Sequence, residues 1–447
     1  MKYKKVGGFI FLFIFFLLAL CVFGYHNNQF DPIWNYGYSY AISRGQVPYR
    51  DFSMVSTPLY SFVMAIGLVF WSNNLMFLIE QALLLTIMFY FLYRLYGVKV
   101  MLLLLAFCFP LFQALVPTYN TFSLFLLVLL IYAEKYWKNG YVIGVILGLL
   151  FCTKQTIGIL VFLPTIYYLI KNKKEFCLRI LGFITPVLIL VCYLAFQGAL
   201  WNFIDFCFLG LVDFGSNNSK VFTLWFYLFL VLFIFMIIYT IKHKENIINY
   251  YILFASIGLM VPIFAYYHFS AFFFLFMIMF LQNVQIKKKF CCLISISLLL
   301  FSCFYSFFLI GNGKDASFLS DVPNFNYYLM TSSSRGELDK LFTIYHKYKN
   351  QDVIMLGFQN TFLKIAENQD LDLYNCLCRG NYGYHGTEKM INRIKKYQNK
   401  IFIINMADYD KAVRDSSHQF DFDIANYVIE HSEKIDAYDY YYVYRME

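Results

Sequence analysis

The residues of this chain that could do chemistry stand at the ends of long apolar runs. Asp31 comes first, a few residues beyond the first run, in the polar and aromatic stretch FDPIWNYGYSY. A carboxylate held among aromatic side chains near a membrane surface is partly desolvated, which makes it a better base once it is ionised. Asp31 also precedes Pro32, and Asp before Pro is a favourable helix start. Asp31 is therefore predicted to be either a general base or the cap of a short helix.

Lys154 is the most informative cation. It lies with Gln155 between two apolar runs, in the stretch GLLFCTKQTIGIL. An ionisable side chain at membrane depth is costly, and it is usually functional or paired. A lysine at this position suits the phosphate of a lipid carrier. The alternative is a lysine that extends from a helix end to place its charge in water.

Arg44, Arg50 and Asp51 follow Asp31 in the same polar segment. Arginine can bind a phosphate through two parallel hydrogen bonds, so both arginines are candidate contacts to a donor or acceptor. Asp51 is a second candidate carboxylate. The alternative is a local ion pair between Arg50 and Asp51 in a solvated loop.

Three further polar residues interrupt apolar runs. Tyr119 and Asn120 stand between two runs, where they are candidate ligand contacts or plain turn residues. His268, in AYYHFSAFF, is either a hydrogen-bonded structural histidine or a reactive one. Asp205 and Asp213 belong to an amphipathic stretch and are expected on a wetted surface. No cluster has the spacing of metal ligands and no phosphate-binding loop is present, so neither a metal nor a cofactor is predicted.

The charge distribution divides the chain near residue 311. Residues 1–311 hold 20 Lys and Arg against 8 Asp and Glu, whereas residues 312–447 hold 16 against 19. The whole chain is 60% hydrophobic and 14% charged, while soluble domains carry about 25% charged residues. Residues 1–311 are therefore predicted to be membrane-embedded and residues 312–447 to form a polar domain. The basic residues lie between apolar runs rather than in a stripe with stacking aromatics, which argues against nucleic acid as a partner.

Eleven apolar runs are candidate membrane helices. They cover about residues 6–24, 75–93, 100–116, 120–134, 140–153, 156–170, 176–196, 221–241, 247–265, 268–284 and 290–310. The shorter run Pro58–Trp71 is expected to lie in or dip into the outer leaflet. With a cytoplasmic N-terminus, 16 basic residues of the first part fall in inner loops and 4 on the outer side, as the positive-inside rule requires. Eleven crossings place residues 312–447 outside the cytoplasm.

Helix-like and strand-like segments alternate along residues 312–447. The predicted helices are Leu338–Tyr348, Thr387–Tyr397 and Phe422–Ser432, and the predicted strands are Asp352–Phe358, Lys400–Asn405 and Tyr440–Arg445. Such alternation is typical of a small α/β domain on a mostly parallel sheet. The predicted fold is therefore an all-α polytopic membrane domain followed by an extracytoplasmic α/β domain.

Taken in order, these segments resemble the GT-C superfamily of membrane glycosyltransferases. Within it they are similar to the protein mannosyltransferase and aminoarabinose transferase group, which is glycosyltransferase family 39-like. The resemblance rests on Asp31, on GQVPYRDF leading to STPLYSFVMAIGLVF, on YRLYGVKV and on ILGLLFCTKQTIGIL, and it covers about residues 1–310. Many members carry Asp-Glu where this chain has Asp31-Pro32.

The resemblance implies a hexosyl or pentosyl transferase with a polyprenyl-phosphate sugar donor and a glycan, lipid or protein acceptor at the outer membrane face. It makes Asp31 the base that activates the acceptor and Lys154 a contact to the donor phosphate. The other candidate contacts to donor or acceptor are Arg44, Arg50, Asp51, Tyr119, Asn120, Gln155 and His268.

Two other functions also fit the apolar composition. One is a transporter or flippase of lipid-linked saccharides, and the other is a non-catalytic scaffold of the cell envelope. A transporter predicts broken helices near the membrane midplane in two related halves, and the sequence shows no such symmetry.

Overall fold

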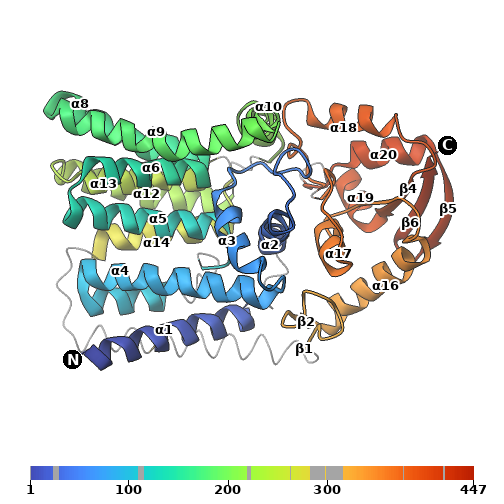
Figure 1. Cartoon of the computed structure of the whole chain (residues 1–447), viewed down its shortest axis with the longest axis horizontal. Helices are drawn as coiled ribbons and strands as arrows, with labels where there is room; N and C mark the ends of the chain where they lie inside the picture. Colours follow the sequence, from blue (N-terminus) through green and yellow to red (C-terminus); the bar gives the residue numbers. More distant parts are fainter. Residues whose placement is uncertain are drawn as a thin grey trace.

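The structure is a computed structural model that describes residues 2–23, 30–108, 115–218, 223–261, 263–281, 297, 316–375, 377–415 and 418–446. Helices make up the chain as far as residue 281, which we call the helical part (Figure 1). Residues 316–446 combine helices with two small sheets, and we call them the C-terminal part. The predicted helix at 290–310 lies outside the described residues apart from residue 297.

The longer helices of the helical part run side by side (Figure 1). They are α1 (Lys2–Phe23), α4 (Asn74–Cys108), α5 (Tyr119–Tyr132), α6 (Gly140–Thr153), α9 (Lys173–Phe196), α12 (Leu224–Lys242), α13 (Ile247–Met260) and α14 (Tyr266–Leu281). Between α6 and α9 the chain forms α7 (Gln155–Phe162), a 3-10 turn η3 (Leu163–Ile166) and α8 (Tyr167–Lys171). Each of these helices coincides with a predicted apolar run.

Gly97 interrupts α4 with a φ of 80° and a ψ of 175°. This region of backbone space is open to glycine and strained for other residues. The break falls within YRLYGVKV, between the runs predicted at 75–93 and 100–116, of which residues 109–114 lie outside the described residues. The predicted separation of these two runs therefore has a physical cause in Gly97.

Within the described residues, three helices are long and apolar enough to cross a membrane: Asn74–Ala106, Lys173–Phe196 and Leu224–Lys242. Only 22% of the apolar window in Lys173–Phe196 and 17% of that in Leu224–Lys242 is buried inside the protein. Such long apolar surfaces are stable only in a lipid environment or against a partner. The other apolar stretches in the described helices are 10–17 residues long, among them Gly7–Cys21 within α1.

Glycines let α6 and α9 approach each other closely. Gly140, Gly144 and Gly148 recur every four residues along one face of α6. A Cβ atom at Gly144 would overlap the carbonyl oxygen of Arg179 in α9, and one at Gly182 of α9 would overlap that of Tyr141. Small residues at this spacing are the usual means by which membrane helices bring their backbones together.

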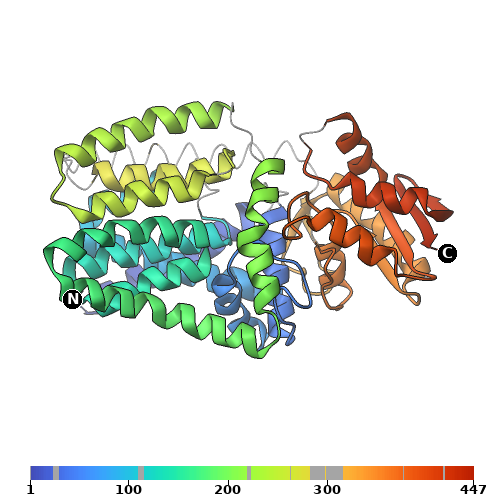
Figure 2. The same cartoon turned by 90° about the horizontal axis from the view of Figure 1, so that it is seen from above.

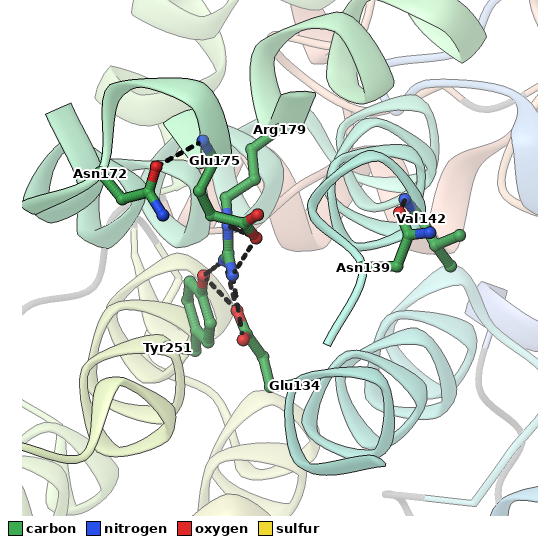
Figure 3. Close-up of polar contacts among 7 residues, drawn as sticks. All are labelled: Glu134, Asn139, Val142, Asn172, Glu175, Arg179 and Tyr251. Atoms are coloured by element: carbon green, nitrogen blue, oxygen red, sulfur yellow. Dashed lines mark hydrogen bonds and ion pairs between the residues drawn. The ribbon is translucent and has the colours of Figure 1, made fainter. Parts of the chain in front are cut away.

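A buried ion cluster joins α5, α9 and α13 (Figure 3). Arg179 is 2% exposed, and both of its terminal nitrogens donate to the carboxylate of Glu134, which lies in the π-helical turn η2 (Ala133–Trp137) that continues α5. Arg179 also donates to Glu175 over 3.2 Å and to the Tyr251 hydroxyl over 2.8 Å. In the sequence, Arg179 counted only as one of the 16 basic residues assigned to the inner loops, so this cluster was not predicted.

The larger sheet of the C-terminal part has the strand order β3-β4-β6-β5. These strands are β3 (Val353–Leu356), β4 (Ile401–Asn405), β5 (Ser432–Tyr438) and β6 (Tyr441–Met446). Only β3 and β4 are parallel, while β4–β6 and β5–β6 are antiparallel. The prediction of a mostly parallel sheet is therefore wrong. It failed because β5 is a largely exposed edge strand, SEKIDAY, without the apolar run that marks a strand in sequence.

Helices cover this sheet: α16 (Ser332–Tyr348), α17 (Asn360–Ala366), α18 (Gly386–Ile394), α19 (Met406–Arg414) and α20 (Phe422–Glu430). A separate antiparallel pair, β1 (Ala316–Phe318) and β2 (Leu329–Thr331), precedes α16. The predicted helices and strands of this region are all present, with ends shifted by a few residues.

The C-terminal part lies at one end of the helical part, and the N-terminus lies at the other (Figure 1). The helices α2 (Phe30–Ser43) and α3 (Leu59–Leu68) stand between the two parts. A further segment there contains α10 (Leu200–Ile204), the π-turn η4 (Asp205–Leu209) and α11 (Leu211–Asn218), and it runs across the boundary between the parts (Figure 2).

Candidate functional site

A pocket lies where the helical part meets the C-terminal part. One wall is the face of α2 that carries Asp31, Trp34, Asn35 and Tyr38. Residues three or four apart lie on the same face of a helix, so α2 directs these side chains together. One of the two alternatives for Asp31 was the cap of a short helix. A helix is present at this position, and Asp31 lies within its first turn.

Other elements complete the pocket. Tyr119 comes from the start of α5, Tyr267 and His268 come from the start of α14, and Phe214 comes from α11. The C-terminal part contributes Cys378, Asn381 and Gln419. Residues far apart in the sequence therefore share one aromatic and polar cavity, of the composition that binds small ligands.

Asp31 is half-buried at the start of α2. Burial raises the pKa of its carboxyl to about 6, and the positive charge of Lys154 opposes this rise. A carboxylate with a pKa near neutrality can both lose its proton at physiological pH and accept one from a substrate.

Lys154 lies between α6 and α7, close enough to Asp31 for the two charges to interact. Its Nζ atom donates to the Asn120 side-chain oxygen over 3.0 Å. The same atom lies 5.7 Å from the centroid of the Tyr119 ring, where the ring face attracts a cation. The structure thus brings together four predicted site residues: Asp31, Tyr119, Asn120 and Lys154.

His268 lines the same pocket and is 4% exposed. Its Nδ1 atom lies 2.7 Å from the carbonyl oxygen of Ile263. Because a carbonyl oxygen only accepts, Nδ1 must carry the hydrogen. This is the hydrogen-bonded arrangement that was the alternative to a reactive histidine.

Gln155 holds the pocket wall in place rather than lining it. Its side-chain nitrogen donates to the carbonyl oxygens of Val55 over 3.1 Å and of Cys207 over 2.9 Å. Val55 is a pocket residue and Cys207 lies in η4. The amide therefore ties two chain segments to the end of α6.

Arg44, Arg50 and Asp51 do not line the pocket. Arg50 donates to both carboxylate oxygens of Asp51 over 2.8 and 2.9 Å, which is the local ion pair of the alternative interpretation. Arg44 donates to Asp370 of the C-terminal part over 3.3 Å. Arg44 therefore connects α2 to the C-terminal part, and Arg50 also donates to the carbonyl oxygen of Gln197 over 3.3 Å.

Asp205 and Asp213 were expected on a wetted surface, and both are partly exposed in the structure. Asp205 accepts hydrogen bonds from the Lys389 ammonium over 2.7 Å and from the backbone N–H of Tyr384 over 3.2 Å. Asp213 accepts one from the backbone N–H of His385 over 2.6 Å. Both carboxylates therefore also bind donors of the C-terminal part.

Sequence reasoning missed the amides and several aromatic residues of the pocket. Trp34, Asn35 and Tyr38 could have been found from their helical spacing to Asp31, since a short helix beginning there was one of the alternatives. Asn381 and Gln419 carry no such signal, because only the packing of the C-terminal part brings them to Asp31.

The chain thus combines apolar helices, a pocket beside a C-terminal α/β part, and a carboxylate in the first turn of the helix that follows α1. No protein-family profile matches this chain, and no curated protein matches its sequence. Its structure is similar to the crystal structure of ArnT from Cupriavidus metallidurans bound to undecaprenyl phosphate. The TM-score is 0.53, the sequence identity is 10%, and the similarity covers 98% of both chains.

The predicted resemblance to the aminoarabinose transferase group of the GT-C superfamily is therefore confirmed at the level of the fold. The similarity extends through the C-terminal part, whereas the sequence resemblance was confined to about residues 1–310. At 10% identity it concerns the fold, so the chemistry has to be argued from the residues in the pocket.

Proposed function

We propose that this chain is an integral membrane glycosyltransferase that transfers a sugar from a polyprenyl-phosphate donor to an acceptor at the outer face of the membrane. The observation that carries the proposal is that Asp31 and Tyr119 line one pocket at the boundary of the two parts, while Lys154 lies against the Tyr119 ring and within electrostatic range of Asp31. The ArnT structure, which holds undecaprenyl phosphate, supports a donor of this class.

In the proposed reaction, Asp31 accepts the proton of the acceptor hydroxyl. The acceptor oxygen then forms a bond to the anomeric carbon as the bond from that carbon to the phosphate oxygen breaks, with inversion. Negative charge develops on the departing polyprenyl phosphate. Lys154 stabilises this charge, and it does so strongly because the site is partly shielded from water.

A groove on the helical part is a candidate site for the polyprenyl tail. Its lining is almost wholly apolar and includes Leu59 and Phe62 of α3, Cys152 of α6 and Leu190 of α9. It lies against α9, whose apolar surface is largely exposed, so a lipid could enter from the membrane. It also reaches Cys152, two residues before Lys154, which would place the phosphate near the pocket.

The orientation of the proposed enzyme in the membrane can be inferred from the charges at the two ends of its helical part. The connections α5–α6, α8–α9 and α12–α13 lie at the end that carries the N-terminus (Figure 1), and they are rich in Lys. We place this end in the cytoplasm by the positive-inside rule. Residues 1–311 then form a multi-pass membrane domain with eleven crossings, and residues 312–447 form an extracytoplasmic domain.

The test is transfer by purified wild type and the variant Asp31→Asn from undecaprenyl phosphate that carries a radiolabelled sugar. Loss of a general base reduces rates by about 100-fold to 10,000-fold, so we expect Asp31→Asn to lose at least about 100-fold. Asp352→Asn is the control, because that carboxylate is 74% exposed and lies in the C-terminal part. Transfer by Asp31→Asn at the wild-type rate would remove Asp31 as the base.

A further inference from the structure

We infer that the pocket binds an uncharged sugar and recognises its hydroxyl groups through amide side chains, two of which come from the C-terminal part. This inference rests on the proposed function and names the class of sugar that the site accepts. It is carried by the charges, the hydrogen bonds and the packing of the pocket.

The first argument concerns charge. Among the described residues that line the pocket, Asp31 is the only carboxylate, and the nearest cation is Lys154. The proposed reaction uses both, since Asp31 must accept a proton and Lys154 must face the phosphate. A cationic sugar could pair only with Asp31 and would occupy the base, while an anionic sugar would compete with the phosphate for Lys154. A buried charge without its own partner binds poorly.

The second argument concerns the side-chain amide of Asn35, whose oxygen is a hydrogen-bond acceptor with a fixed orientation. Asn35 is 2% exposed. Its side-chain nitrogen donates to the backbone carbonyl oxygen of Asp31 over 2.7 Å. Because that carbonyl can only accept, the amide has one possible orientation. Its oxygen Oδ1 is then buried at the pocket and has no hydrogen-bond partner in the described part of the chain. A sugar hydroxyl would supply the missing donor.

The third argument is that the C-terminal part presents two more amides. Asn381 and Gln419 line the pocket opposite α2. Their two segments are joined by a hydrogen bond of 2.9 Å from the Arg379 backbone N–H to the Gln419 carbonyl oxygen. The contacts of Asp205 and Asp213 with residues 384–389 hold this region on the helical part.

The packing at this point is close. Gly383 has a φ of 81°, and a Cβ atom there would overlap the Asp205 carboxylate. Gly380, with a φ of 79°, packs in the same way against Phe214, another pocket residue. The backbone on both sides of Asn381 is thus packed closely against the helical part. Aromatic rings around the two amides can pack against the apolar face of a sugar ring, as in other ligand pockets.

The experiment compares binding of three lipids to the purified full chain: undecaprenyl phosphate, undecaprenyl phosphate glucose and undecaprenyl phosphate aminoarabinose. The three lipids share the tail and the phosphate, and the two sugars differ in charge. We expect the glucose lipid to bind at least about tenfold more tightly than the aminoarabinose lipid. Equal or tighter binding of the aminoarabinose lipid would overturn the inference.

A charge variant tests the same inference from the protein side. Gln419→Glu adds a carboxylate to the pocket at an exposed position, so it should tolerate the change. We expect the affinity of this variant for the aminoarabinose lipid, relative to its affinity for undecaprenyl phosphate, to rise by about tenfold. Gln398→Glu is the matched control, since Gln398 is exposed and lies away from the pocket lining.

The outcomes separate this inference from the proposed function. Failure of all three lipids to bind would contradict the proposed function itself. Binding of undecaprenyl phosphate with a preference for the cationic sugar would leave the proposed function standing and refute the uncharged sugar. An unchanged preference in Gln419→Glu would remove Gln419 as a sugar contact.

Discussion

At the scale of single residues, burial and the charge of Lys154 have opposite effects on the pKa of Asp31. Burial favours the neutral form of Asp31, while the charge of Lys154 favours the carboxylate. The outcome is a pKa of about 6, compared with about 3.9 for an exposed aspartate. The two residues are 123 positions apart in the sequence, and the packing of α2 against the junction of α6 and α7 brings their charges into range.

The pH dependence of transfer tests this balance. Because Asp31 must be ionised and Lys154 must be protonated, we expect kcat/KM to rise with pH through about 6 and to fall above about 7, the value to which burial lowers the pKa of the Lys154 ammonium. Lys154→Met removes the charge that lowers the pKa of Asp31, so the rise should move to higher pH. Lys395→Met, an exposed control, should leave the profile unchanged. A rise near pH 4 in the wild type would show that Asp31 is not desolvated or is not the base.

At the scale of elements, α2 shows why a polar segment follows the first apolar helix. Its residues at spacings of three and four face the pocket, and its other side packs against α3, α4 and α17. For example, Tyr36 of α2 packs against Phe77 of α4 at 5.3 Å between ring centroids. The segment is therefore a buried helix with a functional face, and its aromatic content serves both sides.

The Arg179 cluster holds the opposite end of the helices. Glu134 follows α5, whose first residue Tyr119 lines the pocket. A rise of about 1.5 Å per residue separates the two by about 22 Å along the helix. The cluster is too far from the pocket to take part in the reaction, and its contacts with α9 and α13 fix the positions of these helices at the inner end.

Replacing Glu134 tests this role. Glu134→Gln leaves Arg179 buried with a weaker partner, which costs about 3 kcal/mol when a buried ion pair is broken. We expect a clear fall in the Tm of the detergent-solubilised protein, while the remaining folded protein keeps its affinity for undecaprenyl phosphate. Glu245→Gln is the matched control, because Glu245 is exposed at the same end. Equal Tm values for both variants would contradict a stabilising role for the cluster.

At the scale of the whole molecule, the C-terminal part closes the pocket. Besides the contacts of Asp205 and Asp213, Gln46 exchanges two hydrogen bonds with the backbone of Leu371, of 2.8 and 2.9 Å. Ser53 donates from its backbone and its hydroxyl to the Asn375 side-chain oxygen. These contacts fix the segment after α2 to the C-terminal part on the side of the molecule away from the N-terminus.

The orientation of the molecule in the membrane gives a further prediction. Cysteines introduced one at a time at Gln398 and Lys138 should differ in their reaction with a membrane-impermeant maleimide, measured against the unsubstituted chain. In intact cells we expect label at position 398, in the C-terminal part, and none at position 138, beside the inner end of α6. Position 138 should react once the membrane is permeabilised. The reverse pattern would place the pocket on the cytoplasmic side and contradict the proposed donor orientation.

The sequence by itself determined the apolar helices, the change of composition near residue 311, and Asp31 and Lys154 as the residues to examine. These features depend on local composition, because apolar runs and isolated charges can be recognised in the sequence without knowledge of which segments pack together. The strand β5 was not predicted, because an exposed edge strand needs no apolar pattern. It is identified only by its pairing with β6 in the structure.

Only the tertiary structure decided which candidates share a site. Arg50 pairs with Asp51 and Arg44 with Asp370, whereas Asn120 binds Lys154 next to the pocket residue Tyr119. It also decided that Asp205 and Asp213 bind the C-terminal part and that Asn381 and Gln419 reach the pocket. Each of these contacts joins segments that lie far apart in the chain. Their formation depends on the summed packing of many helices, which no local stretch of residues encodes.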